Sequence, residues 1–111
     1  MKKFEKEHLL ELYRKMYLIR AAENKIIHEY FNDEMKTPVH LSVGEEAIPV
    51  GVLDVLPENT KVFGTYRSHG LYLSKTEDLK GFFGEMYGRA MGVNRGKAGS
   101  MHLMNPDLGV M

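Results

Sequence analysis

The sequence predicts a mostly α-helical chain of the α/β class, with short strands between helices. Three observations predict this class. Apolar residues recur at helical spacing from Phe4 to Phe31, a short β-type segment follows a Pro-Glu-Asn turn at residues 57–59, and a second amphipathic stretch follows Thr76. The length of 111 residues fits one domain.

Region 1–35 is predicted to form one long helix, ending near residues 32–34. Its apolar face carries Leu9, Leu12, Met16, Ile19, Ile26 and Tyr30. Glu23 falls on that same face, and Arg20 lies three residues before it. Because residues three apart are neighbours on a helix, Arg20 and Glu23 are predicted to form a structural ion pair.

Region 36–87 is predicted to mix helices with a short strand. Residues 37–41 should be extended, since Pro38 disfavours a helical residue before it. Ser42 and Glu45 match a capping box, which predicts a helix from there to about Leu56. Pro49 lies within that helix, so a kink or a late start is expected.

The strand of this region is predicted at residues 61–66, which places residues 67–70 at its end, where open α/β sheets bind ligands. A small helix should follow to Ser74. Thr76 is predicted to cap a last helix that runs to Tyr87 and stops at Gly88. The buried side of that helix is predicted to hold Leu79, Phe82, Phe83 and Met86.

Region 88–111 is predicted to be a long loop. Glycines recur at positions 88, 92, 96, 99 and 109 between Arg89, Arg95 and Lys97. Loops of this length without secondary structure are usually functional or disordered.

Composition excludes several classes of function. The chain has 15 Lys and Arg residues and 15 Asp and Glu residues, so it has no overall positive electrostatic field to attract the phosphates of nucleic acid. No apolar run is long enough to cross a membrane, and charged residues from Glu5 onward argue against a signal peptide. The sequence has no cysteine, which fits a cytoplasmic setting.

Common chemical motifs are also missing. The glycines around Lys97 lack Walker spacing, and no G-x-G-x-x-G or G-x-S-x-G occurs. The five histidines never fall at metal-ligand spacing, so no metal site is predicted within the chain.

The remaining candidates are polar residues at the ends of predicted elements. These are His40, the run Tyr66-Arg67-Ser68-His69-Gly70, and the run Ser100-Met101-His102. An arginine can hold a diphosphate with two hydrogen bonds, a tyrosine can pack on a ring, and a histidine can contact a small carboxylate or ketone. Each residue taken alone is more often structural.

The order of these pieces resembles the α subunit of the thiamine diphosphate-dependent 2-oxo acid dehydrogenases, the first component of pyruvate, branched-chain 2-oxo acid and acetoin dehydrogenase complexes. The resemblance spans nearly the whole chain. It rests on Leu12-Tyr13-Arg14 with Ile19-Arg20 and Glu23, His40-Leu41 with Gly44-Glu45-Glu46-Ala47, Tyr66-Arg67-Ser68-His69-Gly70, and Gly96-Lys97-Ala98-Gly99-Ser100-Met101-His102.

The resemblance implies an α/β thiamine diphosphate-binding fold, of which this chain would be the N-terminal part. It assigns Tyr66 and Arg67 to the cofactor, with Arg67 at the diphosphate, and His40 and Tyr66 to the substrate. His69, Ser100 and His102 would shape the pocket and loop. No residue is assigned as catalytic.

Two positions depart from the family pattern, because Glu45 and Ala98 stand where glutamine and glycine are usual. A positive φ at position 98 would disfavour alanine. The family's Mg²⁺ ligands are expected beyond residue 111, so the chain alone is expected to be inactive and to leave apolar faces uncovered.

By the resemblance, the subunit decarboxylates a 2-oxo acid and passes the acyl group to a lipoyl-bearing acyltransferase. The site would form with a β subunit in a heterotetramer. Pyruvate, branched-chain acids and acetoin-like substrates all remain open. The first alternative is a non-catalytic remnant that serves as an assembly or interaction module, and the second is a plain helical structural domain.

Overall fold

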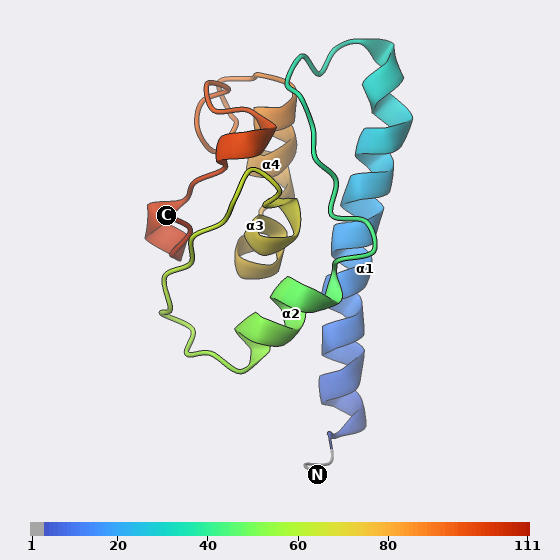
Figure 1. Cartoon of the computed structure of the whole chain (residues 1–111), viewed down its shortest axis with the longest axis vertical. Coiled ribbons are helices and arrows are strands. Elements are labelled where there is room, and N and C mark those ends of the chain that lie inside the picture. Colours follow the sequence, from blue (N-terminus) through green and yellow to red (C-terminus); the bar gives the residue numbers. More distant parts are fainter. Residues whose placement is uncertain (1–3) are drawn as a thin grey trace.

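The computed structural model describes residues 4–111 as a mostly helical chain (Figure 1). Residues 1–3 lie outside the described residues. They include the start of the predicted region 1–35 and the basic residues that were compared with a signal peptide. Helix α1 spans Lys6–Glu29 and continues into the short 3-10 helix η1, Tyr30–Asn32. The predicted long helix is therefore confirmed, and Asp33 ends it in a left-handed conformation with φ 59°.

Helix α2 spans Ala47–Asp54, so the expected late start is confirmed. Pro49 is the third residue of α2, where its missing N–H costs nothing because amides of the first turn have no partner within the helix. The predicted capping box is wrong. The Ser42 hydroxyl accepts a hydrogen bond from the Gly70 amide instead, and lies before the helix begins.

The predicted strand at residues 61–66 is also wrong. Within residues 4–111 this stretch forms only a one-residue parallel bridge between Val62 and Val110. The Val62 amide donates to the Gly109 carbonyl at 2.7 Å, and the Met111 amide donates to the Val62 carbonyl at 2.9 Å. A strand needs a partner along its length, and here only one residue supplies it.

Helices α3, His69–Thr76, and α4, Leu79–Met86, follow one another closely. The residue that caps α4 is Asp78, whose Oδ1 accepts from the Gly81 amide at 2.9 Å. The predicted cap by Thr76 is wrong, because the Thr76 hydroxyl donates to the Tyr72 carbonyl at 2.8 Å in the last turn of α3.

Within residues 4–111, four α-helices supply most of the buried core. Helix α1 runs along one side of the molecule, α3 and α4 lie on the other, and α2 contacts both α1 and α3 at one end (Figure 1). The connector of residues 33–46 runs back along α1 toward α2. The largest buried apolar side chains are Ile19, Ile26, Tyr72, Leu73, Phe82 and Met86.

Residues 88–111 fold into turns and two 3-10 helices, η2 at Ser100–His102 and η3 at Pro106–Leu108. The expectation of uncovered apolar side chains is confirmed, because Phe31, Val55 and Phe63 are 88%, 77% and 76% exposed. No helix within residues 4–111 has the length and apolar character required to span a membrane.

Candidate functional site

Three separate segments bring the sequence-predicted site residues together: the connector, the turn before α3, and the loop that contains η2. The rings of His40 and Tyr66 meet edge to face, with centroids 4.6 Å apart and planes 63° apart. This geometry is favourable for aromatic pairs. The connector residue His40 and the pre-α3 residue Tyr66 are therefore neighbours.

Arg67 reinforces the same junction. Its Nη1 donates to the Leu41 carbonyl at 2.5 Å, so consecutive residues of one segment contact consecutive residues of the other. Arg67 also lines a cavity of about 260 Å³ with Ser42, Pro49 and other residues of α2 and α3. The Arg67 side chain is exposed, and within residues 4–111 its guanidinium donates one hydrogen bond to the protein, to the Leu41 carbonyl.

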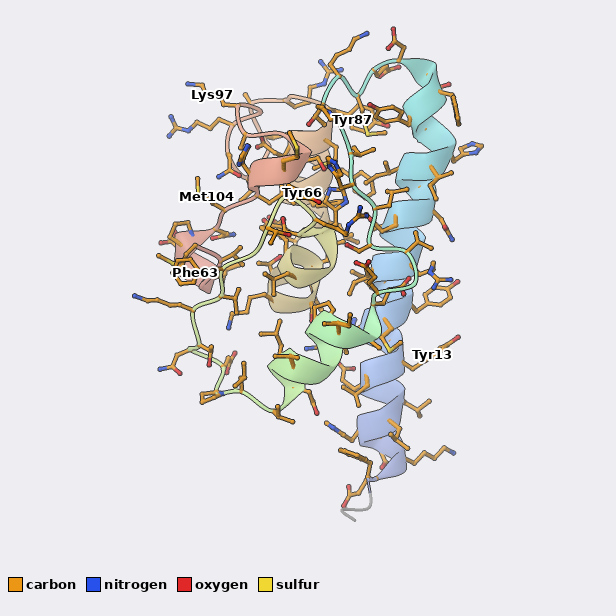
Figure 2. The ribbon with its side chains drawn as sticks, in the orientation of Figure 1. Tyr13, Phe63, Tyr66, Tyr87, Lys97 and Met104 are labelled. Atoms are coloured by element: carbon orange, nitrogen blue, oxygen red, sulfur yellow. The ribbon has the colours of Figure 1, made fainter. Side chains whose placement is uncertain are left out.

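Tyr66 and His102 line a second cavity, of about 300 Å³, together with Met101 and Leu103. Tyr66 lies in the middle of the molecule near η2 (Figure 2). Its side chain is 55% exposed, so it could contact a ligand in this cavity. His40, Tyr66 and His102 thus border one region.

His69 and Ser100 lie deeper and are completely buried. His69 Nδ1 lies 2.8 Å from Glu23 Oε1, and His69 Nε2 lies 2.5 Å from Ser100 Oγ. The order resembles a Ser-His-acid arrangement, but a nucleophile without exposed surface cannot reach a substrate. Neither side chain is exposed, so the arrangement lacks the access that a reacting nucleophile needs.

The predicted ion pair between Arg20 and Glu23 is wrong. Glu23 faces His69 and the Ser42 amide, whereas Arg20 points to Glu46. The hydrogen bond from Arg20 lowers the pKa of Glu46 and is the largest influence on it. A buried carboxylate requires partners, and Glu23 finds them on other elements rather than on its own helix.

Sequence reasoning missed Glu85, which organises the glycine-rich loop. Its carboxylate is 1% exposed and accepts four backbone amides, from Asn94 at 2.7 Å, Gly96 at 3.0 Å, Ala98 at 2.8 Å and Gly99 at 3.0 Å. Burial by itself raises the pKa of Glu85, but these amides outweigh burial and hold the pKa below its ordinary value.

The loop around Glu85 takes the tight path that its glycines permit. Gly96 and Gly99 have φ 75° and 69°, and Arg95 has φ 59°. Ala98 is not among the residues with positive φ, so its methyl group is compatible with the loop. In the sequence, the signal for this arrangement is an acidic residue, Glu85, just before a glycine-rich run.

Among the residues that the structure describes, no group of three His, Asp or Glu side chains is placed to hold a metal ion. The site assembled here therefore consists of aromatic, imidazole and guanidinium groups around two cavities. Such a set can bind an anion and a ring, because the guanidinium and imidazole groups supply hydrogen-bond donors and the aromatic side chain supplies a face to pack on.

Known proteins match this chain along nearly all of its length. The family model described as "Dehydrogenase E1 component" matches residues 14–109. The alpha subunit of acetoin:2,6-dichlorophenolindophenol oxidoreductase from Bacillus subtilis (strain 168) is 38% identical over 105 residues, which are 95% of this chain and 32% of that protein.

Two further relatives are pyruvate dehydrogenase E1 component alpha subunits. The mitochondrial protein of Saccharomyces cerevisiae is 37% identical over 101 residues, 91% of this chain and 24% of its own length. The protein of Rhizobium meliloti is 38% identical over 104 residues, 94% of this chain and 30% of its own. The chain spans about a third or less of these relatives, and over that span it belongs to the dehydrogenase E1 component family.

Proposed function

We propose that this chain supplies the front portion of an α subunit that decarboxylates a 2-oxo acid with thiamine diphosphate and passes the acyl group to a lipoyl-bearing acyltransferase. The observation that carries the proposal is the meeting of His40-Leu41 with Tyr66-Arg67. These are the positions to which the family resemblance assigns substrate and cofactor contacts.

The residues present fit the cofactor. Arg67 donates one hydrogen bond to the Leu41 carbonyl. The other N–H groups of its exposed guanidinium are available to a diphosphate, which guanidinium groups bind with two hydrogen bonds. His40 Nδ1 is buried and has no hydrogen-bond partner within residues 4–111. A buried polar atom without a partner is costly, so a ligand at this position would be stabilising.

Each residue has a distinct task in the proposed reaction. Thiamine diphosphate supplies the carbon nucleophile and electron sink for decarboxylation. Arg67 would bind its diphosphate, with Mg²⁺ held by ligands outside this chain. Tyr66 would pack against the bound molecules, while His40 would orient the substrate carboxylate. The Ser100-Met101-His102 turn would close the cavity beside Tyr66 and limit access of water.

The proposed enzyme is a heterotetramer with a β subunit in a cytoplasmic setting. Pyruvate, branched-chain 2-oxo acids and acetoin-like compounds are the substrates to compare, because the relatives include both pyruvate and acetoin enzymes.

The non-catalytic alternative is an assembly module, favoured by one feature of α1. Leu9, Leu10, Tyr13 and Tyr17 are at least half exposed on this helix, and Tyr13 projects away from the other helices (Figure 2). Exposed apolar groups of this size mark interaction surfaces. This reading predicts binding to a β-type partner without any turnover.

The test joins this chain to the remaining C-terminal part of the Rhizobium meliloti pyruvate dehydrogenase relative and combines it with a β subunit, magnesium and thiamine diphosphate. Release of carbon dioxide from a 2-oxo acid, lost in Arg67→Ala and kept in Arg89→Ala, would support the enzyme. Arg89 is an exposed arginine that lines neither cavity described above. Assembly with β but no release from any of the acids would favour the interaction module.

A further inference from the structure

The carboxylate of Glu23 joins parts of the molecule that are distant in sequence. From the middle of α1, Glu23 Oε2 accepts the Ser42 amide at 2.7 Å, and Oε1 lies 2.8 Å from His69 Nδ1. Glu23 and His69 have no exposed surface, and Ser42 is 4% exposed. Neither oxygen therefore has solvent as a substitute partner.

The hydrogen bonds continue beyond this carboxylate. His69 Nε2 lies 2.5 Å from Ser100 Oγ, and the Ser100 amide donates to Thr37 Oγ1 at 3.0 Å. The Gly70 amide donates to Ser42 Oγ at 3.3 Å. Helix α1, the connector, the start of α3 and η2 are thus linked through one buried polar network.

This network touches each segment of the candidate site next to its exposed side chain. Ser42 follows His40 by two residues, His69 follows Arg67 by two, and Ser100 precedes His102 by two. Over two residues a folded backbone has little freedom to change the direction of a side chain. Fixing Ser42, His69 and Ser100 therefore fixes where His40, Arg67 and His102 point.

The network also dictates the position of one proton. An ionised carboxylate can only accept hydrogen bonds, so His69 must carry its hydrogen on Nδ1 to satisfy Glu23 Oε1. The Ser100 hydroxyl can donate or accept, so it adapts to Nε2. If the hydrogen were on Nε2 alone, the unprotonated Nδ1 would face Glu23 Oε1. Two buried acceptors would then lie against each other without a hydrogen between them, which is costly.

We propose that Glu23 is a positioning residue that fixes the hydrogen of His69 on Nδ1 and so holds the three site segments in one arrangement. The functional part of this inference rests on the proposed function, whereas the structural part does not. Glu23 itself touches neither cavity described above, and its effect on a ligand would pass through His69 and Ser42.

Nitrogen-labelled histidine allows a direct test in this 111-residue chain by NMR. The five histidines include one in each site segment, His40, His69 and His102, and two on α1, His8 and His28. The wild-type spectrum should show a protonated Nδ1 on His69. An unprotonated Nδ1 there would overturn the proposal even if every variant failed to fold.

Glu23→Gln is the decisive variant, since it keeps shape but replaces one accepting oxygen with a donating amide. It should alter the Nδ1 signal of His69 and shift His40 and His102, while His8 and His28 stay unchanged. The matched control is Glu46→Gln, which changes another buried carboxylate that pairs with Arg20 and does not contact His69. Equal spectra for His69 in wild type and Glu23→Gln would contradict the proposal.

A binding measurement then links positioning to function. In the assembly with the β subunit, Glu23→Gln should weaken binding of magnesium thiamine diphosphate roughly tenfold, the equivalent of about 1.4 kcal/mol. Glu46→Gln should bind like wild type. Equal binding by wild type and Glu23→Gln would overturn the positioning role and leave the proposed function intact. Absence of binding by wild type would refute the proposed function, and the NMR result would still decide the role of Glu23.

Discussion

Gly92 packs directly against the backbone of Glu85, so that a methyl group added at Gly92 would lie 2.6 Å from the Glu85 amide nitrogen. Gly84, the residue before Glu85 in α4, makes the reciprocal approach, because a methyl group added at Gly84 would lie 2.8 Å from the Gly92 amide nitrogen. This close approach lets the glycine-rich loop wrap around the end of α4. The loop that carries Ser100 and His102 depends on it.

Gly92→Ala is predicted to destabilise the fold by about 1–3 kcal/mol, because the clash is with backbone that cannot rotate away. The control is Gly51→Ala in α2, where an added methyl group meets nothing within 4 Å. It should stabilise by about 0.5–1 kcal/mol through the better helix propensity of alanine. Urea unfolding of both variants measures the contrast, and a neutral Gly92→Ala would show that the loop does not pack on α4.

Glu85→Gln is predicted to lower the free energy of unfolding by about 2–4 kcal/mol. In the wild type, four backbone amides of the loop donate to two carboxylate oxygens, whereas the glutamine side chain has only one accepting oxygen. The exposed Glu34→Gln serves as the control and should change stability little. Thermal unfolding near neutral pH measures the difference. An unchanged midpoint for Glu85→Gln would contradict the four hydrogen bonds to the loop.

The contribution of Glu85 should depend on pH. Because its pKa in the folded state lies below the ordinary value of 4.5, its stabilisation is present above that value and is lost as pH falls through the folded pKa. The stability gap between wild type and Glu85→Gln should therefore be full near neutral pH and shrink in acid. A stability difference that grew larger in acid would contradict the lowered pKa of Glu85.

Tyr72 should titrate well above the ordinary value of a tyrosine. Burial, followed by its 2.8 Å hydrogen bond to Asp78, raises the pKa of Tyr72 to about 12. Its contribution to stability is complete below the ordinary value of 10.0 and is lost as pH rises toward the folded pKa. Phenolate absorbance should show a titration step near pH 12 that is absent in Tyr72→Phe. If Tyr72→Phe kept the same late titration step, the step could not belong to Tyr72.

Local patterns in the sequence were enough to predict α1, the late start of α2 and the burial of Phe82 and Met86 in α4, whereas Leu79, predicted on the same buried side, is 39% exposed. Each depends on spacing within one element. The predicted strand at residues 61–66 is wrong because β pairing depends on a partner far along the chain. In the part of the chain that the structure describes, only Val110 pairs with this stretch, at Val62. The caps failed because Ser42 and Thr76 found better partners in Gly70 and Tyr72.

The site shows the same division. His40, Tyr66 and Arg67 could be named from sequence because the order of motifs resembles a known family. Glu23 and Glu85 could not be placed, because their partners come from other segments. The sequence offered Arg20 as the neighbour of Glu23, whereas the fold gives Glu23 two buried donors and gives Arg20 the carboxylate of Glu46.

The most direct test of the central claim is isothermal titration of magnesium thiamine diphosphate into this chain, alone and assembled with the remaining C-terminal part and a β subunit. The proposal predicts binding only in the assembly. Arg67→Ala should weaken it by roughly 10- to 100-fold, as expected for losing hydrogen bonds to a charged group, while Arg89→Ala binds like wild type. Tight binding by the chain alone would contradict the expected need for the other segments, and an assembly that binds equally with and without the Arg67 guanidinium would contradict the assigned site.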